Sequence, residues 1–139
     1  MNQIVYTSEY QEWFDDLADR KAQARIVVRL QRIENGQFGV GINMNKKSGL
    51  KKFDVVDFLD SEANIAAYMN AVFDEAGDDP AFIAQSLGHI ARARGMSKIA
   101  KETGLSRESL YRALSGQGNP EFGTILKIFK VLGLRLQTI

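Results

Sequence analysis

The chain has 139 residues, of which 45% are hydrophobic and 25% are charged, as in globular domains that bury a core. It contains no Cys and a single His, His89, which excludes disulfides, thiolate metal sites, a Cys nucleophile and a His-based metal cage. No apolar run reaches the roughly 20 residues that span a bilayer, and residues 1–10 do not form a secretion signal. We therefore expect a cytoplasmic protein with no membrane contact and no cofactor.

Charge is distributed in blocks along the chain. Residues 1–52 carry nine Lys and Arg against six Asp and Glu, residues 53–91 carry eight acids and no Lys or Arg, and residues 92–139 carry nine basic residues against three acids. Such blocks suggest a basic face for phosphate and an acidic face for a basic protein. The alternative is that the acids are solvated helix caps.

The first third of the chain reads as a strand and a helical hairpin. Residues 3–6 read as a short strand, and Ser8 can cap a helix with Tyr10, Trp13, Phe14 and Leu17 on one face. A second helix over residues 21–35 has Ala22, Ile26, Leu30 and Ile33 on one face and Arg25, Arg29 and Arg32 on the other. Asn35-Gly36 ends it, and residues 36–49, rich in Gly and Asn, read as a linker.

A new pattern begins at Phe53. Residues 53–59 are expected to be extended, and Ser61 to cap a helix to about Ala76 with Ile65, Met69, Val72 and Phe73 facing inward. Asp79-Pro80 opens a helix that ends at Gly95 and buries Phe82, Ile83, Leu87, Ile90 and Ala91. A last helix over about 122–132 buries Ile125, Ile128, Phe129 and Leu132. Residues 134–136 then alternate like a strand that could pair with a second copy.

Two short helices with a tight turn follow Gly95. Ser97 is expected to cap a helix over 98–103, and Ser106 a second helix over 107–114. Gly104 allows the first helix to end abruptly, and the small Ala100 allows the helices to cross closely. The expected core of this helix-turn-helix is Ile99, Ala100, Gly104, Leu105, Leu110 and Leu114. An ordinary helical hairpin in a bundle is the alternative interpretation.

The second of these helices carries long polar side chains between its core positions. Arg suits guanine and Glu suits the cytosine amine, so the predicted base contacts are Arg107, Glu108, Tyr111 and Arg112. The predicted phosphate contacts are Ser97, Lys98, Lys101, Ser106 and Asn119. Because one helix reads few base pairs, we expect a homodimer on double-stranded operator DNA, with half-sites about 34–36 Å apart.

Residues 53–136 resemble the HigA-type antitoxins, also described as addiction-module antidote proteins. The most specific parts are ARARGMSKIAKETGLSRESLYRALS (residues 91–115) and GNPEFGTILK (residues 118–127). The resemblance implies a mainly α, lambda-repressor-like helix-turn-helix bundle, repression of the module's own operon, and binding of a cognate toxin. Many relatives of the wider superfamily open this motif with a phosphate-binding Gln, which Gly95-Met96-Ser97-Lys98 lacks.

Residues 1–39 resemble the start of a different family, the RelE-like toxins. TSEYQEWFDDLADRKAQARIVVRLQRIENGQFG (residues 7–39) is similar to that family's first strand and helical hairpin, whereas the later strands with its catalytic residues are absent. The predicted organisation is a toxin-like fragment (1–39), a linker (40–52) and an antitoxin-like DNA-binding domain (53–139). Without those strands, the apolar face of the hairpin must pack against another surface, either of its own chain or of a partner chain. The alternative is that the hairpin self-associates or is loosely ordered.

The sequence therefore favours a DNA-binding repressor that is the antitoxin of a type II module with a RelE-like toxin. A phage-type regulator without a toxin partner is the alternative. An enzyme would have to use His89, the pair Asp15/Asp16 or the pair Asp78/Asp79, and a ribosome-dependent endoribonuclease is the least favoured. These residues fit packing, solvation and helix capping better than catalysis, so we predict no enzyme.

Overall fold

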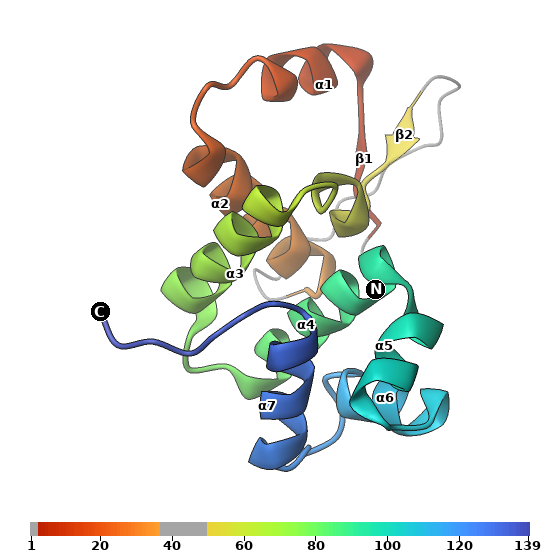
Figure 1. Cartoon of the computed structure of the whole chain (residues 1–139). Coiled ribbons are helices and arrows are strands. Elements are labelled where there is room, and N and C mark those ends of the chain that lie inside the picture. Colours follow the sequence, from red (N-terminus) through yellow and green to blue (C-terminus); the bar gives the residue numbers. More distant parts are fainter. Residues whose placement is uncertain (1–2, 37–49) are drawn as a thin grey trace. The chain divides into compact units, whose positions relative to one another are not determined.

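The computed structural model describes residues 3–36 and 50–139, which are mainly helical (Figure 1). These residues form two compact units, Met1–Ala71 and Val72–Ile139, and the boundary falls inside a helix, after Ala71. We describe each unit by itself. Most of the predicted linker, residues 40–49, lies outside the described residues.

The first unit contains two short strands and several helices. Strand β1 (Val5–Tyr6) pairs antiparallel with β2 (Lys51–Lys52), so that Val5 faces Lys52 and Tyr6 faces Lys51 (Figure 1). Its helices are α1 (Ser8–Asp15), α2 (Arg20–Glu34), the short 3-10 helix η1 (Val55–Phe58) and most of α3 (Glu62–Ala76). The strand and the helical hairpin predicted near the N-terminus are thus present, and the predicted linker's last two residues form a strand.

Local capping residues set the helix ends of this unit. The Thr7 hydroxyl accepts the Tyr10 amide at 3.1 Å, so α1 is capped one residue before the predicted Ser8. Asp19 caps α2, and Gly36 follows its end with a φ of 77°, as predicted for Asn35-Gly36. The Asp54 carboxylate accepts the Val56 amide at 3.0 Å and starts η1. The prediction of an extended 53–59 segment was therefore wrong, because a capping Asp stabilises a turn there.

The buried face of α2 differs from the predicted one. Its buried residues are Ala24, Val27, Val28 and Gln31, whereas Ala22, Ile26, Leu30 and Ile33 are only half-buried. Helix α2 packs against η1, whose Val55 and Phe58 are buried. Helix α2 is therefore covered by η1 of its own chain, one of the covers considered from the sequence, whereas α1 has no buried residue and Trp13 stays 51% exposed.

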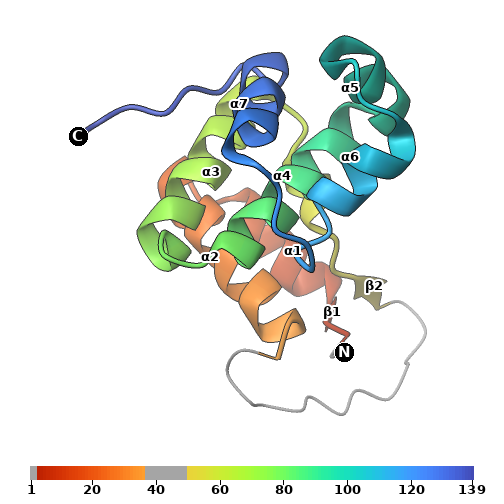
Figure 2. The ribbon, with the colours of Figure 1, turned by 90° about the horizontal axis from the view of Figure 1, so that it is seen from below.

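The second unit is built from the end of α3 and four further helices. These are α4 (Pro80–Arg94), α5 (Met96–Thr103), α6 (Arg107–Ala113) and α7 (Phe122–Val131). Asp79 caps α4 with Pro80 in its first turn, as predicted. Helix α5 packs against α4, α6 and α7, and α5 and α6 lie side by side in both views (Figures 1 and 2). The core of this unit includes Leu87, Ile90, Ile99, Leu110, Ile128 and Leu132.

Several details of the second unit differ from the predictions, and Ile83 and Ile125, predicted to be buried, are only half-buried. Phe73 remains 37% exposed, although its ring meets the Phe129 ring edge-on at 6.5 Å. Ser97 lies inside α5, which begins at the buried Met96, so it is not the cap. Residues 134–136 form no strand within the single chain, so their predicted pairing with a second copy stays a prediction. A Schellman turn at Gly133 (φ 73°) ends α7, with the Leu134 amide donating to the Phe129 carbonyl oxygen.

Within residues 3–36 and 50–139, no helix combines the length and the apolar character that a membrane crossing requires. In the same described part of the chain, His, Asp and Glu side chains form no group of three that could hold a metal ion.

Candidate nucleic-acid interface

Helices α5 and α6 are joined by the three-residue turn Gly104-Leu105-Ser106. Gly104 adopts a left-handed conformation with φ 77°, which an L side chain rarely takes, so glycine allows α5 to end within one residue. The Thr103 hydroxyl donates to the carbonyl oxygens of Ile99 and Ala100, at 2.8 and 3.1 Å. The Ser106 hydroxyl accepts the Ser109 amide at 3.0 Å and caps α6, as predicted. Local chemistry therefore fixes both ends of the turn.

The inward side of the two helices is apolar and closely packed. Ile99, Ala100, Leu110 and Leu114 are buried as predicted, and Leu105 in the turn is half-buried. On α4, a Cβ at Gly88 would lie 3.0 Å from the carbonyl oxygen of Leu114, so the end of α6 approaches the α4 backbone directly. This packing holds α6 in a fixed orientation with its opposite side free for solvent.

The outward side of α6 presents the four predicted base-contacting side chains. Arg107, Glu108, Tyr111 and Arg112 are all exposed. The Arg107 guanidinium carbon lies 5.9 Å from the centre of the Tyr111 ring, within the range of a cation–π contact. An Arg112 nitrogen lies 3.3 Å from a Glu108 carboxylate oxygen. Exposed pairs one helical turn apart contribute only about 0.3–0.5 kcal/mol, so these side chains can exchange this contact for a ligand at little cost.

The predicted phosphate contacts lie on α5 and in the two turns. Ser97, Lys98 and Lys101 are exposed on α5. Ser106 is exposed, but its hydroxyl donates to the Ser109 hydroxyl at 2.9 Å in addition to capping α6. Its hydrogen-bonding capacity is therefore largely used inside the protein.

Asn119 lies with Arg112 in one groove of the second unit. This groove, of about 300 Å³, is lined by Leu105, Ser109, Arg112, Ala113, Gly118, Asn119, Pro120 and Thr124. The structure thus brings together one predicted base contact and one predicted phosphate contact. Ser109 and Thr124 were missed from the sequence; the spacing of Ser109, three residues after the cap Ser106, was the available signal.

The exposed surface of α5 and α6 is basic on balance. Lys98, Lys101, Arg107 and Arg112 are exposed, against the exposed Glu102 and Glu108. A surface with excess cations next to side chains with long hydrogen-bonding ends has the chemistry for both a phosphate backbone and base edges.

Comparison with known proteins places the chain in a family. A family profile described as "Probable addiction module antidote protein" matches residues 49–139, so the chain belongs to that family. An uncharacterized protein of Haemophilus influenzae strain Rd is 51% identical over 88 residues, which cover 63% of this chain and 89% of the relative. No solved structure gives a significant match.

The matched region contains α3–α7 and the whole α5–turn–α6 surface, whereas residues 1–48 lie outside it. An addiction-module antidote is the antitoxin of a toxin–antitoxin pair, and the family therefore suggests a non-enzymatic regulator. The profile does not reach the N-terminal segment, so its resemblance to a RelE-like toxin stays a prediction.

Proposed function

We propose that this antidote protein is a sequence-specific DNA-binding repressor of its own operon, with α5 and α6 as a helix-turn-helix and α6 as the recognition helix. The observation that carries the proposal is the outward face of α6, where four long polar side chains project from a helix anchored by buried Leu110 and Leu114. The major groove admits an α-helix, and its base edges are read by side chains of this kind.

The residues take different roles in this proposal. Arg107 and Glu108, in the first turn of α6, reach base edges, and Tyr111 and Arg112 contact a base or the adjacent backbone. Lys98 and Lys101 on α5 contact phosphates, together with Ser97 and Asn119. Ser106 acts mainly by fixing the start of α6, since its hydroxyl is already bonded within the helix.

The repressor acts as a homodimer on two half-sites, because a single recognition helix contacts too few base pairs for useful specificity. Residues 134–136 pair with no strand in the described part of their own chain, and α7 supplies a second candidate surface for the dimer. Helix α7 offers Phe122 and Leu126, which are 65% and 42% exposed and lie one helical turn apart. A Leu126→Asp variant is expected to shift the protein to monomer in light scattering.

The DNA-binding proposal is tested by gel-shift titration against the DNA upstream of the gene. Arg107→Ala should cost about 1–3 kcal/mol of binding free energy and relax base preference at one position. Lys98→Ala should weaken binding to all sequences alike. It should also reduce the slope of the logarithm of the binding constant against the logarithm of the salt concentration by about one.

Arg135→Ala is the matched control, since this exposed arginine belongs to the C-terminal segment that runs away from α5 and α6 (Figures 1 and 2). It should bind operator as the wild type does. Equal losses for Arg107→Ala and Arg135→Ala would show that only overall charge matters and would contradict the proposed recognition helix.

The second activity we propose is neutralisation of a RelE-like toxin, supported by membership of the antidote family. Expression of the toxin encoded in the same module should arrest growth, and co-expression of this chain should restore it. A chain that represses transcription but restores no growth would instead be a phage-type regulator without a toxin partner. The chain itself should not cleave mRNA in a ribosome-dependent assay.

A further inference from the structure

The N-terminal segment, residues 4–34, packs on a surface that belongs to a different part of the sequence. That surface consists of β2, η1 and the start of α3, residues 51–68, and we call it the receiving surface. The family profile matches the chain only from residue 49 onward, so the receiving surface lies inside the antidote region and the segment that covers it lies outside. Both belong to the first compact unit.

The segment adds a strand to the receiving surface. The Phe53 amide donates to the Ile4 carbonyl oxygen at 2.8 Å, and the pairing continues through β1 and β2. Addition of an edge strand by main-chain hydrogen bonds is a common way in which one polypeptide binds another, because it requires little of the side chains.

The helical hairpin of the segment supplies the side-chain contacts. The Phe14 ring meets the Phe58 ring edge-on with centroids 6.0 Å apart, and the Arg20 guanidinium donates to the Asn64 side-chain oxygen at 2.9 Å. The Tyr68 hydroxyl donates to the Gln31 side-chain oxygen, and both residues are buried. The segment thus supplies polar partners as well as apolar cover.

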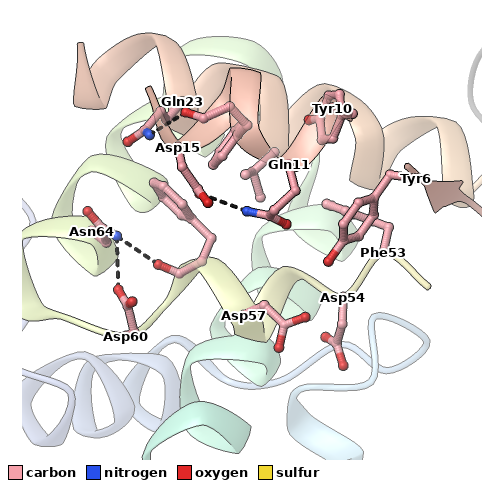
Figure 3. A pocket seen from close by; sticks show the side chains of 13 residues that line it. Tyr6, Tyr10, Gln11, Asp15, Gln23, Phe53, Asp54, Asp57, Asp60 and Asn64 are labelled. Carbon is pink, nitrogen blue, oxygen red and sulfur yellow. Dashed lines mark hydrogen bonds between the residues drawn. The ribbon is translucent and has the colours of Figure 1, made fainter. Parts of the chain in front are cut away.

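The contact between the two parts borders a half-open cavity. A cavity of about 150 Å³ lies along it, lined from the segment by Tyr6, Tyr10, Gln11 and Asp15 and from the receiving surface by Phe53, Asp54, Asp57 and Asp60, among others (Figure 3). A partly open rim with polar side chains is usual at an interface between two polypeptides.

The receiving surface carries apolar side chains between its acidic ones. Phe53, Val55, Phe58 and Leu59 are all buried in the folded chain, and apolar side chains that become exposed together mark a site of protein association. The Phe14 ring covers part of these apolar side chains, so an antidote region without residues 4–34 would present that part of the surface to another polypeptide.

We infer that residues 51–68 are the surface through which this antidote protein binds its toxin, that the toxin presents a strand followed by an amphipathic helical hairpin, and that residues 4–34 occupy the surface in cis. This inference rests on the proposed neutralisation of a toxin and names its site. In the chain as it stands, the segment competes with the toxin at the high effective concentration that a short linker gives.

The test uses a chain with a specific protease site between residues 37 and 49 and the substitutions Val5→Cys and Lys52→Cys. These positions face each other in the β1–β2 pair, and the chain has no other Cys, so oxidation locks the segment in place even after cleavage. This chain, which we call the acceptor, also carries Trp13→Phe, at the position of the only tryptophan. The probe is a separate peptide with the wild-type sequence of residues 1–36. It contains the only tryptophan in the mixture, so the fluorescence anisotropy of Trp13 reports its binding to the acceptor.

We expect the cleaved, reduced acceptor to bind at least ten times as much probe as the cleaved, oxidised acceptor binds. A Phe14→Ala probe should bind about tenfold more weakly, because it lacks the ring that meets Phe58. Toxin of the same module should displace the probe from the reduced acceptor.

Three results would overturn the inference. Equal uptake by reduced and oxidised acceptor would place the probe elsewhere. No uptake by the reduced acceptor would make the segment an inseparable part of one core, and uptake without displacement by the toxin would show that the toxin binds another surface. A gel shift on the same samples separates these results from failure of the proposed repressor, since DNA binding by the second unit does not depend on the lock.

Discussion

The Tyr68 hydroxyl donates a hydrogen bond to the side-chain oxygen of Gln31, and both side chains are buried. The two residues are 37 positions apart, one on α3 in the antidote region and one on α2 in the N-terminal segment. This buried polar contact joins parts of the chain that the sequence assigned to different families.

Tyr68→Phe should lower the free energy of unfolding by about 1–3 kcal/mol, because it removes the donor from a buried pair. Gln31→Met, of similar shape, should cost a comparable amount. The double variant should cost clearly less than the sum of the two, since the hydrogen bond between the two side chains is lost only once. Urea unfolding measures all three, and Tyr111→Phe, at a ring that is 50% exposed, is the control expected to change little. Strict additivity would show that the hydrogen bond contributes nothing.

Ser106→Ala should destabilise the protein by about 1 kcal/mol and weaken operator binding, because Ser106 caps the helix proposed to enter the groove. Ser97→Ala is the matched comparison, since this exposed serine lies inside α5 and caps nothing. In thermal unfolding, the free energy of unfolding of Ser97→Ala should lie within about 0.5 kcal/mol of the wild-type value. A larger loss for Ser97→Ala than for Ser106→Ala would contradict the helix boundaries described above.

Gly104→Ala should destabilise the protein by about 1–2 kcal/mol, although a Cβ there would meet no atom within 4 Å. The cost comes from the backbone, whose φ of 77° is unfavourable for an L side chain. Gly123→Ala is the opposite case, because this glycine lies in α7 without a positive φ and a Cβ there also meets nothing within 4 Å. It should stabilise the protein by about 0.5–1 kcal/mol. Denaturant titration of both variants should therefore give opposite signs.

Glu34, at the end of α2, should make stability depend on pH. Burial, and then the negative charge of Asp54, raise the pKa of Glu34 from 4.5 to about 7, although Lys52 acts to lower it. The folded protein then holds this proton more tightly than the unfolded chain does, so stability falls as the pH rises from about 4.5 to about 7.

Glu34→Gln should remove this decline, so the variant gains stability relative to the wild type across that interval in urea unfolding at several pH values. Glu12→Gln, at an exposed position on α1, is the control and should keep the wild-type profile. A decline of the same size in Glu34→Gln would assign the pH dependence to other groups.

Much of the second unit could be predicted from the sequence because short-range interactions determine it. The Asp79 cap, the positive φ of Gly104 and the Ser106 cap each involve residues within four positions of one another. The exposed polar face of α6 follows from the spacing of Leu110 and Leu114 along one helix. The error at Ser97 arose where several local patterns were compatible with the same residues.

The sequence by itself determined where most helices begin and end and which side chains α6 turns outward, since caps, glycines and helical periodicity act within a few residues. Only the tertiary structure decided that Ala24, Val27, Val28 and Gln31 form the buried face of α2 and that residues 4–34 pack on residues 51–68. Helix α2 has apolar side chains around much of its circumference, so periodicity alone cannot select the buried face. The partner that covers it, η1 and the start of α3, lies too far along the chain for any local pattern to specify.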